Sequence, residues 1–157
     1  MATRTGGRRL GALVAALTMS SAFAASALAG GATVTRGDLN AFAAGTGQSI
    51  TGHAQMVRTP DGRTIVTIHV EGLAPGVTYA SHVHAAACGT GFADGHFKFD
   101  PAGAAMPPNE IWPGPFTTNE AGIGNANTIA DGTAGPGAVS VVVHAPGGAK
   151  IACADLG

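Results

Sequence analysis

The most regular feature of the chain is an alternation of apolar and polar side chains that begins near residue 50. Small or apolar residues occupy every second position over 50–56, and a similar alternation returns over 64–71. Between the two stretches, Pro60-Asp61-Gly62 has the composition of a tight turn. Because successive side chains of a strand point to opposite faces, the pattern predicts a β-hairpin with one apolar face. His53 and His69 fall on the polar face, and we expect both to point to solvent.

The rest of the chain has the pattern of further short strands separated by turns. The segment 30–47 is rich in small residues and predicts a weak edge strand or a disordered start, whereas the proline-rich segment 87–115 is typical of a loop. The other predicted strands are 77–85, 138–145 and 149–156, together with 116–121 and 123–130, which we expect to form a second hairpin. Many short strands with turns at this spacing predict an all-β antiparallel sandwich or flattened barrel.

The first 29 residues differ in composition from the rest. Three arginines precede a mostly apolar run over 10–25, and Ala27-Leu28-Ala29 fits the small-residue pattern of a cleavage site. We therefore expect a signal peptide that directs the protein to the periplasm or the exterior. Arg8-Arg9 leaves twin-arginine export open beside general secretion. The predicted organisation is a signal peptide over 1–29, a poorly patterned segment over 30–48 and one domain over 49–157.

Charge and hydropathy exclude two classes of partner. The chain carries a formal net charge of −1, and its nine acidic residues outnumber the basic residues that remain once the leader arginines are removed. A domain of this charge without a basic stripe does not fit a nucleic-acid binder. Beyond the leader, no apolar stretch approaches the roughly 20 residues needed to span a bilayer. The pattern leaves a monomer and a homodimer equally open.

The histidines provide the candidate chemistry. His82 and His84 alternate in the predicted strand 77–85, so they share one face and lie roughly 6 to 7 Å apart along it. His96 in the loop and His144 at the end of a strand are two further candidates. Imidazoles without a neighbouring thiolate suit copper or zinc better than calcium or magnesium, which prefer oxygen ligands. We therefore predict a transition-metal centre, and copper(II) is the tighter-binding of the two metals in the Irving–Williams order.

Cys88 and Cys153 are the two cysteines of the chain. In an exported protein such a pair suggests a disulfide, and this one would close a loop of about 65 residues. The alternative is a pair of metal-binding thiolates.

Several short motifs occur together in a fixed order over the segment 49–157, and by them the sequence resembles the copper/zinc superoxide dismutases. A single His-Val-His motif is common, but this order and the late lysine-to-cysteine spacing are specific. The motifs are Gly72-Leu73-Ala74-Pro75-Gly76, His82-Val83-His84, Cys88, Gly95-His96-Phe97, Val142-Val143-His144 and Gly148-Ala149-Lys150-Ile151-Ala152-Cys153. The resemblance implies a Greek-key antiparallel β-sandwich and an enzyme that converts superoxide to oxygen and hydrogen peroxide.

The resemblance also implies a role for each site residue. His82, His84 and His144 match copper ligands, and His96 matches the histidine that joins copper to zinc and passes a proton to the product. Lys150 stands where the family has an arginine that positions superoxide. An ammonium keeps the positive charge but loses the planar two-pronged donor geometry of a guanidinium. The resemblance further implies that Cys88 and Cys153 form the intrachain disulfide.

The sequence departs from the family at its zinc site. The segment 97–143 contains no histidine, and only scattered acidic residues remain as oxygen ligands: Asp94, Asp100, Glu110, Glu120 and Asp131. The stretch between His144 and Cys153 is also too short for the family's charged guidance loop. We therefore expect a copper-only site without zinc, in which the hydrogen-bond partner that orients His96 is not identified. A noncatalytic secreted protein that binds or buffers copper is the alternative function.

Overall fold

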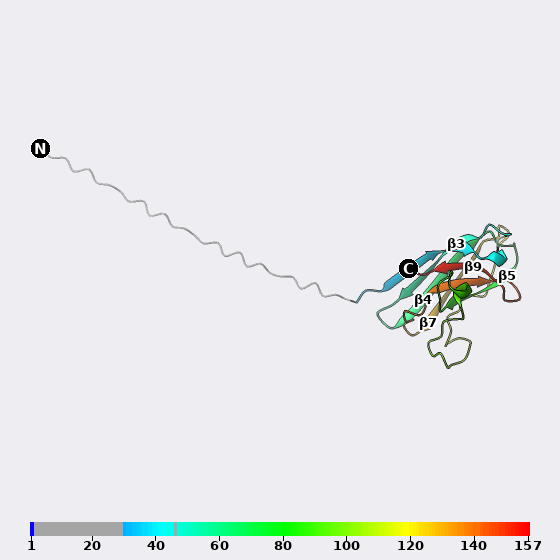
Figure 1. The fold of residues 1–157 in the computed structure, drawn as a ribbon. Helices are drawn as coiled ribbons and strands as arrows, with labels where there is room; N and C mark the ends of the chain where they lie inside the picture. Colours follow the sequence, from blue (N-terminus) through cyan, green and yellow to red (C-terminus); the bar gives the residue numbers. More distant parts are fainter. Residues whose placement is uncertain (2–29, 46) are drawn as a thin grey trace.

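The computed structural model describes residues 1, 30–45 and 47–157, and almost all of these lie in one β domain (Figure 1). The signal peptide predicted over 1–29 falls outside the described residues, apart from Met1, and stays a prediction. Within the described part, no helix is long and apolar enough to cross a membrane. The helical turns described are two short 3-10 segments, η1 (Ala43–Gly45) and η2 (Gly91–Ala93).

Two antiparallel sheets form the domain, and the predicted all-β sandwich is confirmed. The four-stranded sheet has the order β1-β3-β4-β7, formed by β1 (Thr33–Asp38), β3 (Thr51–Arg58), β4 (Arg63–Glu71) and β7 (Gly124–Asp131). The five-stranded sheet has the order β2-β9-β8-β5-β6, formed by β2 (Asn40–Ala41), β9 (Lys150–Asp155), β8 (Ser140–His144), β5 (Thr78–His84) and β6 (Phe116–Thr117). The hairpin predicted from the alternating pattern is β3 paired with β4.

The segment 30–47 contributes an edge strand to each sheet. β1 pairs with β3, and β2 pairs with β9. Leu39 lies between the two strands, is buried, and donates its backbone N–H to the carbonyl of Gly52. Of the two alternatives left open for this segment, the edge strand is correct, because one buried leucine and two short ladders bind it to both sheets.

The hairpin predicted over 116–130 is wrong. A turn does occur there, since the N–H of Asn119 donates to the carbonyl of Ile123, but the two strands enter different sheets. β6 pairs with β5, whereas β7 pairs along its whole length with β4. The ring of Phe116 packs on Tyr79 and lies over Gly124, which has no side chain to obstruct it. The long ladder to β4 therefore outweighs a local pairing between two adjacent strands.

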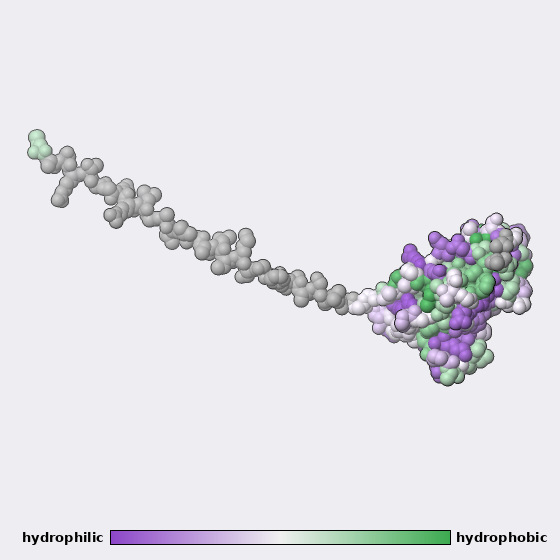
Figure 2. Space-filling model, in the orientation of Figure 1, coloured by the Kyte–Doolittle hydropathy of each residue, from purple (hydrophilic) through white to green (hydrophobic). Residues whose placement is uncertain are grey.

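The core lies between the sheets, and this fixes which face is available for a site. β5 and β8 send Val83, Val141 and Val143 into the core, and the residues between them point to the outer face of the five-stranded sheet. The long connection from β5 to β6 lies against that outer face where His96 and Trp112 meet β5, and it also projects beyond the sheets (Figure 1). Much of the projecting part is hydrophilic on the face seen in Figure 2. The candidate site therefore lies under a long connection on a rigid sheet.

Candidate metal centre

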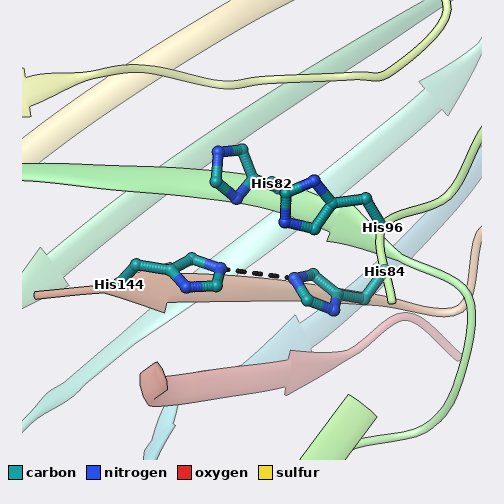
Figure 3. A group of neighbouring side chains, drawn as sticks. All are labelled: His82, His84, His96 and His144. Atoms are coloured by element: carbon teal, nitrogen blue, oxygen red, sulfur yellow. Dashed lines mark hydrogen bonds between the residues drawn. The ribbon is translucent and has the colours of Figure 1, made fainter. Parts of the chain in front are cut away.

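Strand parity and one loop contact bring the four predicted histidines together. His82 and His84 alternate with the core residue Val83 on β5, and His144 ends β8 opposite Ala80 of β5. His96 is held against the end of β5 by a backbone bridge to His84. Figure 3 shows the four imidazoles pointing toward one another. The structure thus gathers on one face side chains that are up to 62 positions apart in the sequence.

The separations within the cluster match those between ligands of a single ion. One ligand atom from each histidine lies within 4.8 Å of the others. The Nε2 atoms of His84 and His144 are 3.3 Å apart, and two nitrogens bound to one metal at about 2.0–2.1 Å in tetrahedral geometry are roughly 3.3 Å apart. The ring centroids of His82 and His96 are 4.1 Å apart. The cluster therefore needs little movement to hold an ion.

Hydrogen bonds leave one free nitrogen of each imidazole for the centre. The Nδ1 atom of His84 lies 3.2 and 3.1 Å from the carbonyls of Ala93 and Asp94, and that of His144 lies 3.1 Å from the carbonyl of Gly148. A carbonyl can only accept, so each Nδ1 carries the proton and each Nε2 carries a lone pair.

In His96 it is again Nδ1 that is hydrogen-bonded, whereas in His82 it is Nδ1 that is left free. Nδ1 of His96 is 2.7 Å from Oε2 of Glu110, which leaves Nε2 free. Nδ1 of His82 is buried and has no hydrogen-bond partner among the described residues. A buried polar atom without a partner is costly unless something binds it. Four lone pairs and no thiolate or carboxylate in the cluster fit copper or zinc.

Burial keeps three of the four histidines neutral in the absence of metal. Desolvation, followed by the nearby His96, lowers the pKa of His82 to about 3 and that of His84 to about 4. Desolvation also lowers the pKa of His144, against a hydrogen bond to the carbonyl of Gly148 that raises it. Neutral imidazoles are the form that binds metals, so little proton competition is expected at neutral pH.

These shifts predict an acid-sensitive apoprotein. An unfolded histidine takes up its proton near pH 6.5, whereas His82 and His84 in the folded state do not until about pH 3 to 4. The unfolded state therefore binds more protons below pH 6.5, and the free energy of unfolding falls as the pH falls. His69 opposes this trend, because its hydrogen bonds to Asn125 and Glu71 raise its pKa.

Urea denaturation of the metal-free, disulfide-intact protein at pH 7.5 and pH 5.0 tests the prediction. We expect a lower midpoint at pH 5.0, and a smaller pH difference in the His82→Gln/His84→Gln variant. Equal midpoints for the wild type would contradict the interpretation that the buried histidines stay neutral. Replacing His69 with Gln should make the pH dependence steeper, since it removes the opposing group.

Glu110 is the hydrogen-bond partner of His96 that the sequence did not identify. Its carboxylate is almost completely buried, with the side chain 1% exposed, and Oε2 also accepts the indole N–H of Trp112 at 2.7 Å. The Trp112 ring in turn packs on His82, with centroids 4.9 Å apart. Glu110 thus joins two imidazoles of the cluster through one carboxylate and one indole. In the sequence it was one of five similar acidic residues, and nothing local distinguished it.

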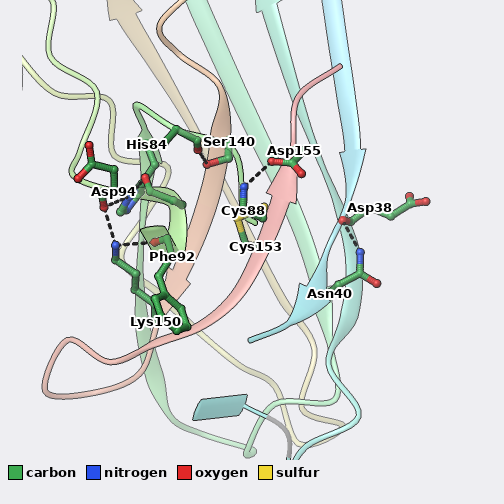
Figure 4. Close-up of a disulfide and its surroundings, with 12 residues drawn as sticks. Asp38, Asn40, His84, Cys88, Phe92, Asp94, Ser140, Lys150, Cys153 and Asp155 are labelled. Atoms are coloured by element: carbon green, nitrogen blue, oxygen red, sulfur yellow. Dashed lines mark hydrogen bonds between the residues drawn. A yellow bond between two sulfur atoms is a disulfide. The ribbon is translucent and has the colours of Figure 1, made fainter. Parts of the chain in front are cut away.

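Lys150 lies at the rim of the pocket that opens onto the cluster, beside His82, His96 and His144. Its Nζ atom donates to the carbonyls of Phe92 and Asp94, at 2.7 and 2.5 Å (Figure 4). The ammonium therefore adds a positive charge near the cluster and also fastens the segment whose carbonyls orient His84.

The disulfide fastens the same segment from the other end. Cys88 and Cys153 are bonded, and the N–H of Cys88 donates to Oδ1 of Asp155 at 2.7 Å (Figure 4). Phe92, Ala93 and Asp94 all have positive φ angles, which few non-glycine residues adopt. Three ties, namely the disulfide, Lys150 and His84, hold this turn in place. The predicted disulfide between Cys88 and Cys153 is confirmed, and the alternative of two metal-binding thiolates is wrong.

Comparison with known proteins supports the fold and no finer assignment. No family model matches the sequence, and no curated protein matches it. Among solved structures, Candida albicans superoxide dismutase 5 in its Cu(II) form aligns with a TM-score of 0.53 and 16% identity, over 78% of this chain and 90% of that chain. Two mutants of the same protein align with TM-scores of 0.55 and 0.54 at 15% and 17% identity, over 80% and 78% of this chain and 91% and 90% of theirs.

Proposed function

We propose that the protein is an exported copper-dependent superoxide dismutase that works without zinc. The observation that carries the proposal is the convergence of four imidazole lone pairs, one of them on a buried His82 nitrogen without a partner. The similarity of the fold to a copper superoxide dismutase supports the same function. The disulfide is compatible with an oxidising compartment outside the cytoplasm.

His82, His84, His96 and His144 would hold the metal, and copper fits better than zinc at equal availability because of its tighter binding. Copper, when bound, supplies one-electron chemistry that oxidises one superoxide to oxygen and reduces the next to hydrogen peroxide. We also propose that no zinc ion binds beside His96, since the Nδ1 atom that would bind it is hydrogen-bonded to Glu110.

The exposure of the four imidazoles suggests which one exchanges protons. The His96 side chain is 29% exposed, whereas His84 is fully buried. Reduction of superoxide to hydrogen peroxide consumes two protons, and Nε2 of His96 is the nitrogen that the hydrogen bond to Glu110 leaves free on this partly exposed ring. Glu110 keeps the Nδ1 proton of His96 in place, so the exchange is confined to Nε2.

Superoxide decay measured by pulse radiolysis tests the proposal. The sample is the disulfide-intact protein loaded with one equivalent of copper and no zinc, with its metal content measured on the same preparation. We expect decay approaching the diffusional limit of roughly 10⁸ to 10⁹ M⁻¹s⁻¹. Stoichiometric copper binding with decay no faster than in protein-free buffer would leave the noncatalytic copper-binding function, which the engagement of the Lys150 ammonium by two carbonyls favours.

Replacing Lys150 tests whether the protein attracts its substrate electrostatically. We expect Lys150→Gln to lower the second-order rate by roughly tenfold and to flatten its dependence on ionic strength, since local positive charge raises the capture rate of anions. The disulfide and the hydrogen bonds to His84 remain in this variant, so the turn should survive. Arg63→Gln is the matched control, because Arg63 is an exposed cation on β4 of the other sheet. An unchanged rate for Lys150→Gln would contradict the guidance role.

A further inference from the structure

The outer face of the four-stranded sheet carries a second histidine pair. The four-histidine cluster lies on the other, five-stranded sheet. His53 on β3 lies directly opposite His69 on β4, and His69 lies opposite Asn125 on β7. On the other side of His53, Asp38 of β1 occupies the opposing position. One row of polar side chains therefore crosses all four strands. His53 is exposed and the His69 side chain is 30% exposed, as expected from the sequence.

Hydrogen bonds orient His69 as they would a metal ligand. Its Nδ1 atom is 2.8 Å from Oδ1 of Asn125, an amide oxygen that only accepts, so Nδ1 donates its proton. The other nitrogen, Nε2, is 2.9 Å from Oε1 of Glu71. This arrangement places an imidazole nitrogen and a carboxylate oxygen on opposite sides of a single proton. A metal ion can replace that proton and be shared by both atoms.

The separation between His69 and Glu71 suits a small cation that accepts nitrogen and oxygen ligands. Two ligands of a tetrahedral zinc ion, each at about 2.0–2.1 Å, are roughly 3.3 Å apart, so the pair of His69 and Glu71 needs to open by only a few tenths of an ångström. The ring of His53 is 5.4 Å from that of His69, centroid to centroid. Side chains at directly opposed positions of an antiparallel pair are within reach of each other. The exposed His53 must turn toward His69 and Glu71 for its ring nitrogen to complete the site.

The charges around the row favour a cation. Glu71 and Asp38 contribute two carboxylates, and Arg36, on the same face of β1, contributes one guanidinium. We propose that His53, His69 and Glu71 form a surface zinc site, separate from the four-histidine cluster and on the opposite sheet. Two imidazoles, one carboxylate and a water molecule make an ordinary ligand set for zinc. The bound ion would join β3 to β4 across the centre of the sheet.

Zinc titration of the full disulfide-intact protein, after loading with one equivalent of copper, tests this proposal. Copper occupies the four-histidine cluster first, since it binds imidazoles more tightly, and the added zinc reports on the surface site. We expect one further equivalent of zinc by calorimetry and equilibrium dialysis. Both His53→Gln and His69→Gln should weaken its binding at least about tenfold, as the loss of a ligand or its support does elsewhere.

Controls separate this site from the cluster and from nonspecific binding. Gln55→Ala changes the next position on the same face of β3 and should leave the zinc equivalent intact. His144→Gln changes the cluster alone and should leave it intact as well. If copper fails to occupy the cluster, the wild type should still bind one more zinc than His53→Gln. No zinc difference between the wild type and His53→Gln, or unchanged affinity in both histidine variants, would overturn the proposal.

Discussion

Removing the disulfide is expected to lower the free energy of unfolding of the metal-free protein by about 4 kcal/mol, the loop-closure value for a loop of this length. Cys88 and Cys153 are 65 positions apart, and the loop that they close includes β6, β7 and β8. The cross-link restricts the unfolded chain over about half of the described domain. A typical domain is stabilised by about 5 to 15 kcal/mol, so a loss of this size is a large fraction of the total.

Urea denaturation of the Cys88→Ala/Cys153→Ala variant measures the effect. Alanine is preferable to serine, because Cys153 is only 3% exposed and a hydroxyl there would be buried. The matched control is the wild type with its disulfide chemically reduced, which keeps both sulfur atoms in place. If the variant and the reduced wild type lose the same free energy, the cross-link is responsible. A loss below about 1 kcal/mol in the reduced wild type would contradict the chain-entropy argument.

Removing the disulfide should also weaken metal binding at the candidate metal centre. The segment from Cys88 to His96 contains the carbonyls that orient His84 and receive Lys150. Without the disulfide, the strained turn at Phe92, Ala93 and Asp94 loses its covalent tie to β9. We therefore expect copper affinity to fall together with stability.

The parts of the site that lie on strands were accessible from the sequence. Side chains in a strand alternate with a period of two, so His82 and His84 had to share a face whatever their neighbours were. His144 follows three valines that mark a buried strand, and the structure places it opposite Ala80, two positions from His82. The exposed positions of His53 and His69 follow from the same parity.

The parts that depend on partners far along the chain were not accessible. The turn at Asn119 looks the same from the sequence whether its two strands pair with each other or enter different sheets, and only the ladder between β4 and β7 decides. Glu110 was likewise indistinguishable from four other acidic residues. It reaches His96 because a bridge between Lys98 and Glu110 folds the connection back on itself. Loop closure of this kind leaves no periodic signal.

Replacing Glu110 is expected to have the largest effect on turnover of any residue that is not itself a candidate metal ligand. Glu110→Gln retains an acceptor for His96 but removes the negative charge, and a charge-assisted hydrogen bond is roughly twice as strong as a neutral one. Partners that orient metal-binding histidines typically contribute about 10- to 100-fold to affinity or activity. We expect Glu110→Gln to lower the dismutation rate by about tenfold and Glu110→Ala by roughly 100-fold.

The two variants also differ in stability, and this separates a positioning role from a structural one. Glu110→Ala leaves the part-buried donors of His96 and Trp112 without an acceptor, at a cost of up to about 1 to 3 kcal/mol each. Glu110→Gln should unfold close to the wild type, so its slower turnover cannot be ascribed to misfolding.

Trp112→Phe keeps an aromatic ring against His82 but removes one donor, and should bind copper normally. The exposed Glu120→Gln is the matched control for loss of a carboxylate. Pulse radiolysis between pH 6 and 9, with the copper absorption spectrum recorded for each variant, tests whether Glu110 positions His96. If Glu110→Gln matches the wild type in rate, pH profile and spectrum, Glu110 does not have this role.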